Sequence, residues 1–505
     1  METWMSSSGL VDKSLVLAED TPLGTRYRML ETLREFAQER LAAANEEDTY
    51  RRRHASVCLQ TTLTLVHNFL TNRDQLASLT LADAEFDNVR EAIAWSIIND
   101  HELGGLLVGS TFEYAMVRAN RVEVQEWSRA LLAHFDDMSV PARASFGACA
   151  GNMIAYAGDV DTGLDLLEAA LAAAREGGDA RSLINALTGT ALVKRLFRND
   201  LATAEELLRE AVQVADEFEV TLHRAHARVL LSWTVPEDDE ARRLLEEGME
   251  LARVTGNRYS EMEALATYAS HLPPDAETEG RLRRSLQLCR MFGEVQLTLE
   301  VRQQLAVFDA SRSGDGDRLT EELTELAEEA RKLGHPRLAA NASRSVANAH
   351  RRAGRFDEAR RWLATARGGH PAPVALVSAL IQRDEGDPAG AGRDLRRSLR
   401  AAVDEIGGPL PSQTPDVLVD MTAVEAADPS ADPRATAVMY WSGRAALETG
   451  TEWDGLKSFA DWEETLQLLS SRLSTEEMAA AEAEGRSRDP AELWDWWLDH
   501  RLPQD

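Results

Sequence analysis

Hydrophobic and polar residues alternate with a helical period in the stretch RYRMLETLREFAQERL, residues 26–41. Apolar side chains three or four positions apart fall on one side of an α-helix, while the charged residues between them face water. The pattern therefore predicts an amphipathic helix. A leucine- and valine-rich run at 14–17 and a turn-forming sequence at 20–24 come before it, and they predict a strand and a wing-like loop. The apolar positions of the helix are Met29, Leu30, Leu33, Phe36, Ala37 and Leu41.

Two segments in the middle of the chain share one arrangement of small and large apolar residues. They are AYAGDVDTGLDLLEAALAAAREGGD, residues 155–179, and HRRAGRFDEARRWLATARGG, residues 350–369. Small residues are needed where paired helices approach closely, and larger ones fill the adjacent layer. Seven equivalent positions near the end of each second helix show the repeat, and the match is weakest at the fifth of them. These positions are Ala170, Ala211, Gly248, Ser285, Leu326, Ala366 and Ser398, separated by 41, 37, 37, 41, 40 and 32 residues.

The repeated arrangement resembles tetratricopeptide repeats, whose period is about 34 residues. We therefore expect about seven antiparallel helix pairs over residues 141–403. Stacked pairs can bury the apolar faces that one pair cannot, so the expected fold is all-α, a tetratricopeptide-like helical-repeat solenoid with a concave groove. Residues 404–505 are expected to form a loop, rich in Gly, Pro and Asp at 405–432, followed by capping helices. The tryptophans of WDWW, residues 494–497, are expected to pack the last helix, with an interface anchor as the alternative.

Four blocks between Leu10 and Ile98 carry a family resemblance: GLVDKSLV, RYRMLETLREFAQERL, RRRHASVCL and EFDNVREAIAWSI. Their order resembles the region after the nucleotide-binding module of bacterial STAND regulators, the AfsR-like and LuxR-type regulatory ATPases. The resemblance implies a winged-helix remnant at 1–48 and a helical linker region at 49–140, ahead of a repeat sensor. The family's P-loop ATPase and its DNA-binding or cyclase effector have no room in this chain. A truncated or diverged gene, a misassigned start codon and a standalone sensor would all give this sequence.

Composition agrees with helices, because 44% of the residues are apolar and only 6% are aromatic. A formal net charge of −30 repels phosphate backbones, so we expect no direct nucleic-acid binding by this chain. Cys58, Cys149 and Cys289 lie far apart and are expected to be buried thiols in a reducing compartment. No apolar run is long enough for a membrane span, so the expected location is the cytoplasm.

The sequence offers no enzyme chemistry. GGLLVGST, residues 104–111, has the glycines and Ser/Thr of a phosphate loop, but it lacks the lysine and the preceding strand. Metal-ligand spacings and the HExxH and GxSxG motifs are also missing. We therefore predict no catalytic, cofactor-binding or metal-binding residues.

Arginine is concentrated in residues 331–400, which hold 15 Lys and Arg against 6 Asp and Glu. Residues 401–505 carry a net charge of −15 by the same count. The arginines form either a solvated helix face or a basic surface that receives the acidic C-terminal region or an anionic partner. The candidate interaction surface comprises Arg351, Arg352, Arg355, Arg396, Arg397 and Arg400.

These patterns together predict a non-enzymatic interaction and effector-sensing module of a bacterial transcriptional regulator or signalling ATPase. It would bind a protein, a peptide or a small ligand in the solenoid groove, and the N-terminal helices would transmit or receive that state. The alternative is a structural adaptor that scaffolds other proteins without sensing.

Overall fold

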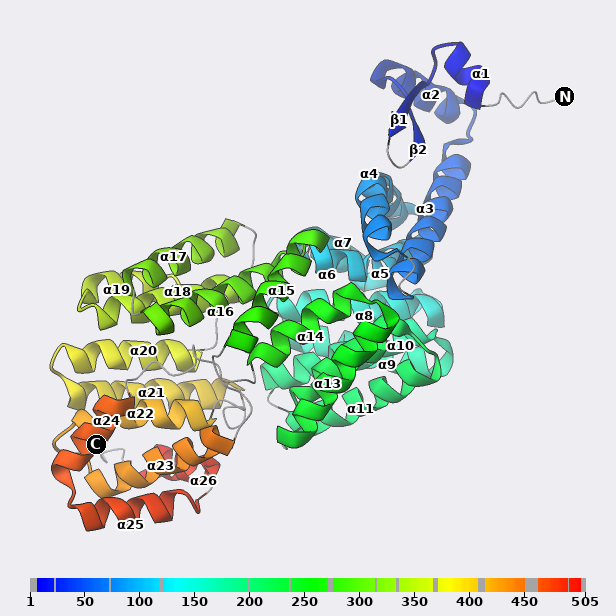
Figure 1. The fold of residues 1–505 in the computed structure, drawn as a ribbon. Coiled ribbons are helices and arrows are strands. Elements are labelled where there is room, and N and C mark those ends of the chain that lie inside the picture. Colours follow the sequence, from blue (N-terminus) through cyan, green and yellow to red (C-terminus); the bar gives the residue numbers. More distant parts are fainter. Residues whose placement is uncertain are drawn as a thin grey trace.

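The computed structural model consists of helices arranged in pairs, preceded by a small unit with two strands (Figure 1). The described residues are 7–21, 24–71, 74–118, 121–198, 200–235, 238–270, 276–313, 316–332, 336–366, 371–406, 414–449, 462–488 and 490–500.

The N-terminal unit holds α1 (Ser7–Asp12), β1 (Leu17–Thr21), β2 (Gly24–Arg28) and α2 (Glu31–Ala43). The strands pair antiparallel, with Leu17 opposite Arg28, and form the hairpin of the expected winged-helix remnant. The helix predicted from residue 26 begins at Glu31 instead, and the strand predicted at 14–17 begins at its last residue. Thr25 and Tyr27 favour a strand, and the cross-strand hydrogen bonds outweigh the helical spacing of the apolar residues around them.

A long helical hairpin joins this unit to the repeats and lies below it in Figure 1. It is made of α3 (Glu47–Leu70) and α4 (Gln75–Asn99). Three short helices and a 3₁₀ turn follow: α5 (His101–Ser110), α6 (Phe112–Arg118), α7 (Arg121–Leu131) and η1 (Leu132–Asp137).

Seven antiparallel helix pairs then stack one on another, which confirms the predicted tetratricopeptide-like solenoid. They are α8 (Val140–Tyr156) with α9 (Val160–Gly177), α10 (Ala180–Val193) with α11 (Leu201–Glu217), α12 (Thr221–Ser232) with α13 (Asp238–Thr255), α14 (Arg258–Ser270) with α15 (Ala276–Phe292), α16 (Gln296–Ser313) with α17 (Gly316–Lys332), α18 (Pro336–Arg352) with α19 (Phe356–Leu363), and α20 (Pro371–Asp384) with α21 (Pro388–Ile406). A π-helical turn, η2 (Lys194–Arg198), extends α10.

Small residues allow the first pair to pack closely. A Cβ atom on Gly151 of α8 would lie 2.7 Å from the Leu167 side chain and 2.8 Å from the carbonyl oxygen of Gly163, both on α9. Ala170 and Ala211 are fully buried, as the repeat register requires. The register is wrong at Ser398, which is exposed, because α21 buries the neighbouring Leu399.

The C-terminal helices cap the stack. They are α22 (Thr414–Ala427), α23 (Pro433–Thr449), α24 (Trp462–Arg472), α25 (Thr475–Gly485) and α26 (Pro490–His500). The prediction of a loop at 405–432 is wrong for α22, because VLVDMTAVEAA is apolar enough around the helix to be buried, with Met421 and Val424 fully enclosed. Trp494 and Trp497 are each 1% exposed, so they pack α26 as predicted.

Candidate functional site

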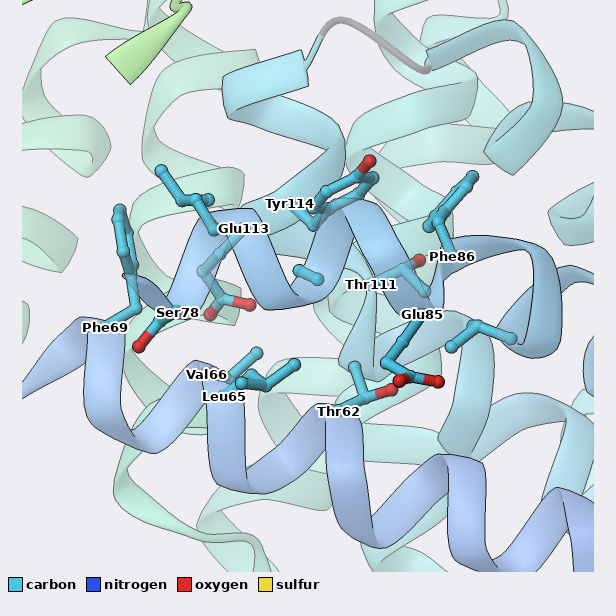
Figure 2. Close-up of a pocket in the computed structure, with 13 residues that line it drawn as sticks. Thr62, Leu65, Val66, Phe69, Ser78, Glu85, Phe86, Thr111, Glu113 and Tyr114 are labelled. Carbon is cyan, nitrogen blue, oxygen red and sulfur yellow. The ribbon is translucent and has the colours of Figure 1, made fainter. Parts of the chain in front are cut away.

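A mostly apolar cavity lies where the α3–α4 hairpin meets α6 (Figure 2). Leu65 and Phe69 of α3 form one wall, and Leu79 and Phe86 of α4 form another. Tyr114 of α6 also lines the cavity. The space open to the centre of a water molecule is about 40 Å³, which is enough for a few waters. An apolar space with a small number of polar groups is the usual form of a small-molecule site.

Glu85 of α4 supplies the first of two carboxylates that line the cavity. Its Oε1 accepts a hydrogen bond from Arg26 Nη1 at 2.9 Å, and its Oε2 accepts one from Asn88 Nδ2 at 2.7 Å. Arg26 lies on β2, and its Nη2 also donates to the carbonyl oxygen of Ala84 at 2.9 Å. This side of the cavity therefore holds the β-hairpin of the N-terminal unit against α4.

Glu113 of α6 supplies the second carboxylate, and Figure 2 shows it on the opposite side of the cavity from Glu85. Its Oε1 accepts from Arg181 Nε at 2.7 Å and from Asn185 Nδ2 at 3.0 Å, while its Oε2 accepts from Arg181 Nη2 at 2.5 Å. Burial would raise the pKa of Glu113, but the two partners on α10 outweigh burial and hold the pKa below its usual 4.5. Burial lowers the pKa of nearby His223 to about 3, so this imidazole stays neutral and Arg181 offsets the charge of Glu113.

The tip of the α3–α4 hairpin makes a second attachment to the repeats. Gln75 Nε2 donates to Asn257 Oδ1 at 3.0 Å, and the backbone N–H of Tyr259 donates to Gln75 Oε1 at 3.3 Å. The Phe69 ring meets the Tyr259 ring edge-on, 5.2 Å between centroids, in a cluster that includes Leu222 of α12. The hairpin and α6 thus contact the first helices of the second, third and fourth pairs.

Arg118, at the end of α6, ties these attachments together. Its Nε donates to Asp83 Oδ1 of α4 at 2.8 Å, and its Nη1 donates to the carbonyl oxygen of Phe292 at the end of α15. Tyr114 also donates to Asp83 Oδ1, at 3.0 Å. One side chain therefore links the hairpin, α6 and the fourth helix pair.

The glycine-rich segment GGLLVGST lies in α5 and at its C-cap. A Cβ on Gly105 would lie 2.7 Å from Met138 Sδ, and one on Gly109 would lie 2.8 Å from the carbonyl oxygen of Ser145. These glycines allow α5 to pack against α8, so the segment is a helix-packing surface.

No group of three or more His, Cys, Asp or Glu side chains in the described part of the chain is arranged to hold a metal ion. None of the described helices is both long enough and apolar enough to cross a membrane.

The structure does not place the six predicted arginines on one exposed surface. Arg351 is 5% exposed and pairs with Asp384 at 2.5 Å. Arg396 is 9% exposed, pairs with Glu425 of α22 at 2.6 Å and lies over the Trp497 ring. A helical pattern of arginines cannot distinguish a solvated face from one that another helix covers, and α22 and α26 cover Arg396.

The other four predicted arginines are more accessible. Arg352 and Arg397 are exposed, and the guanidinium of Arg397 lies 3.4 Å from Asp394 of its own helix. Arg355 donates to Asp317 at 3.1 Å, and Arg400 donates to the carbonyl oxygen of Leu498 at 3.4 Å. Arg396 and Arg400 therefore contact the C-terminal helices, through the Glu425 carboxylate and the Leu498 carbonyl oxygen, and the basic interaction surface stays a prediction.

A polar groove of about 660 Å³ lies near the ends of α18, α20 and α22. Arg351 and Arg352 line it together with Arg383, whose side chain is 5% exposed. Arg383 is held by Asp384 at 2.5 Å and by Glu464 of α24 at 3.4 Å. Three arginines and two carboxylates, Asp384 and Glu464, therefore line the groove.

Sequence comparison finds similarity to bacterial regulators over part of the chain. A "Putative HTH-type transcriptional regulator" of Mycobacterium bovis is 34% identical over 188 residues, which is 35% of this chain and 21% of that protein. A protein of the same description from Mycobacterium tuberculosis matches equally. The predicted resemblance to bacterial regulators is confirmed. The chain spans about a fifth of the length of these relatives, and no family model matches it.

Solved structures with a related arrangement include a STAND protein with a tetratricopeptide repeat sensor from Pyrococcus horikoshii. It is 14% identical, the match covers 80% of this chain and 60% of that one, and the TM-score is 0.43. A Rap protein complexed with competence and sporulation factor is 12% identical, with 86% and 99% covered and a TM-score of 0.40.

Sequence reasoning missed the residues that join the N-terminal helices to the repeats. Glu113 and Arg181 lie 68 positions apart, and Gln75 and Asn257 lie 182 apart. Nothing in one sequence pairs such distant groups. The one local signal was that Glu113 and Gln75 are polar residues beside apolar runs near helix starts.

Proposed function

We propose that this chain is the protein-interaction and effector-sensing module of a bacterial transcriptional regulator or signalling ATPase, working in the cytoplasm without catalysis of its own. The repeats bind a protein, a peptide or a small ligand. The helices α3–α7 pass the bound state to the N-terminal unit. With its net charge of −30, the chain leaves nucleic-acid binding to another part of the regulator.

The position of Glu113 carries this proposal. Its carboxylate lines the cavity beside the α3–α4 hairpin and also forms the buried ion pair with Arg181 on α10. A movement of α10 relative to α8 or α12 therefore changes the environment of α6 and of the cavity. Glu85, on the other side of the cavity, makes the corresponding link to Arg26 in the N-terminal unit. Sensing requires such a physical connection between two sites.

The similarity to transcriptional regulators supports the same conclusion, because it places related sequence inside larger regulatory proteins. The chain spans only a fifth of those relatives. The activity of the whole regulator therefore enters here as part of the proposal.

Hydrogen exchange of the backbone amides distinguishes a sensor from an adaptor. The variant Glu113→Gln keeps the shape of the side chain and removes its charge. In a sensor, we expect faster exchange both in α10 and in α3 and α4, because the link between them is weakened. In an adaptor, faster exchange stays within α6 and α10.

Asp384→Asn is the matched control, because it weakens a similarly buried ion pair with Arg351 inside the sixth and seventh helix pairs. It should leave exchange in α3 and α4 unchanged. If Glu113→Gln also leaves α3 and α4 unchanged, the sensing mechanism is wrong and the adaptor is favoured.

A further inference from the structure

The cavity between α3, α4 and α6 has a specific chemical character. Its walls are mostly apolar, with a few hydroxyl groups among them, and its two charged groups, Glu85 and Glu113, are both carboxylates. No lysine or arginine belongs to its lining. An anionic ligand would find no cation in the lining, whereas a cationic ligand with an apolar body would find both a carboxylate and an apolar wall.

The two carboxylates differ in how firmly they are held. Glu113 accepts three hydrogen bonds from α10, and its side chain is 11% exposed. The side chain of Glu85 is 29% exposed and, among the described residues, forms an ion pair with Arg26, whose side chain is 33% exposed. A carboxylate offers about four acceptor positions, and in the described part of the chain Arg26 and Asn88 each donate one hydrogen bond to Glu85. Glu85 is therefore the carboxylate that a ligand can engage.

We propose that this cavity binds a small organic amine. Its apolar body lies among the side chains of Leu65, Phe69 and Leu79, and its ammonium group binds the carboxylate of Glu85. This inference rests on the proposed sensing function and adds to it a ligand class and a second site, in the helices that join the repeats to the N-terminal unit.

Binding has a direct structural consequence, because the ammonium competes with the guanidinium of Arg26 for Glu85. Arg26 holds β2 to α4 through Glu85 and through the carbonyl oxygen of Ala84. When the first of these contacts weakens, the N-terminal unit loosens from the helical hairpin. The amine thus stabilises the cavity while it releases the unit before it.

Three probes of nearly equal shape, small enough for the cavity, test the charge requirement: propylamine, 1-propanol and propanoate. The full-length protein is heated with each, and the midpoint of thermal unfolding is followed. A ligand that binds only the folded state raises this midpoint. We expect the largest rise with the amine, a smaller one with the alcohol and none with the acid. Limited trypsin digestion should cut residues 7–43 faster in the presence of the amine alone.

Two variants give opposite effects, which a merely structural role would not produce. Glu85→Gln should abolish the advantage of the amine over the alcohol. Arg26→Ala removes the competitor and should tighten amine binding several-fold, while it makes residues 7–43 sensitive to trypsin without any ligand. Ala82→Leu fills the cavity and should weaken binding of both the amine and the alcohol.

Equal shifts with all three probes, or an amine effect that persists in Glu85→Gln, overturn the proposal. So does the lack of any shift with ethylamine, propylamine and butylamine. These failures remain distinct from a failure of the sensing function, because the exchange experiment on Glu113→Gln uses no ligand. An amine that binds without changing trypsin access would sustain the site and overturn the competition with Arg26.

Discussion

Glu113 on α6 and Arg181 on α10 form a buried ion pair between the N-terminal helices and the repeats. Their side chains are 11% and 12% exposed, and Arg181 Nη2 also donates to the carbonyl oxygen of Gly109 at 3.0 Å. The pair is a non-covalent contact between two parts of the chain that lie 68 positions apart in sequence. Replacing the two side chains singly and together measures how much the ion pair contributes to the free energy of unfolding.

Removal of one partner should be costly. Arg181→Met leaves Glu113 buried without its cation, and we expect a loss of about 3 to 5 kcal/mol in the free energy of unfolding. The double variant Glu113→Leu with Arg181→Met replaces both charges with apolar groups and should recover most of that loss. Urea unfolding of the wild type, both single variants and the double variant measures the cycle. Additive losses would show that the two side chains do not act as a pair.

Two glycines should respond oppositely to alanine. Gly151→Ala places a methyl group 2.7 Å from Leu167 and 2.8 Å from a backbone oxygen, so overpacking should cost about 1 to 3 kcal/mol. Gly280 lies in α15 with nothing within 4 Å of an added Cβ, so Gly280→Ala should gain about 0.5 to 1 kcal/mol. Thermal unfolding of both variants tests the close approach of α8 and α9. A stable Gly151→Ala protein would contradict that packing.

The arginines of α21 should also respond differently to charge reversal. Arg396→Glu places a carboxylate beside buried Glu425 and removes the cation over Trp497, so α22 and α26 should detach. Arg397 is the matched control, because its side chain is 79% exposed. Limited trypsin digestion should reach Arg434 and the helices after it in the first variant only. Equal digestion patterns would show that Arg396 belongs to a solvated helix face and does not hold α22 and α26.

Glu294, at the start of α16, should make stability depend on pH. Burial, with the charge of Glu300 as the next cause, raises the pKa of Glu294 from 4.5 to about 8. Between these values the unfolded chain loses a proton that the folded protein keeps, so the folded state binds more protons and stability falls as pH rises from about 4.5 to 8. Glu294→Gln removes this dependence and should become the more stable protein by pH 8.

The measurement for Glu294 is the urea midpoint of the wild type and the variant at pH 5, 6.5 and 8. Other groups titrate in the same range, so the informative quantity is the difference between the two proteins at each pH. Glu328→Gln, a change at an exposed position of α17, provides the control and should track the wild type. A constant difference between the wild type and Glu294→Gln would show that Glu294 is ionised throughout.

The sequence predicted the repeats because their determinants are local. Small residues such as Ala170 and Ala211 recur with the helix pairs, and a residue that must be small is visible without a partner. Prediction was wrong where two local patterns competed. The strand pairing of residues 24–28 outweighed the helical spacing that continues beyond it, and the apolar residues of α22 outweighed the Gly, Pro and Asp around them.

The candidate site was not predicted, because its residues meet only through the tertiary fold. Glu85 resembles many other carboxylates on helix surfaces until the hairpin and α6 enclose it. The same limit explains the arginines: Arg396 and Arg397 are neighbours in sequence, yet one is covered by α22 and the other is exposed. Burial of a charged side chain depends on its partner, and the partner lies far away in the chain.

The hydrogen bond between Gln75 and Asn257 can form only late in the synthesis of the chain. Their separation of 182 positions means that a ribosome adding about 5 to 20 residues per second adds Gln75 roughly 10 to 40 s before it adds Asn257. During that interval Val66, Phe69 and Leu70 lack the later helices that bury them. The apolar tip of the hairpin is therefore exposed to aggregation with other chains until the fourth helix pair is synthesised and covers it.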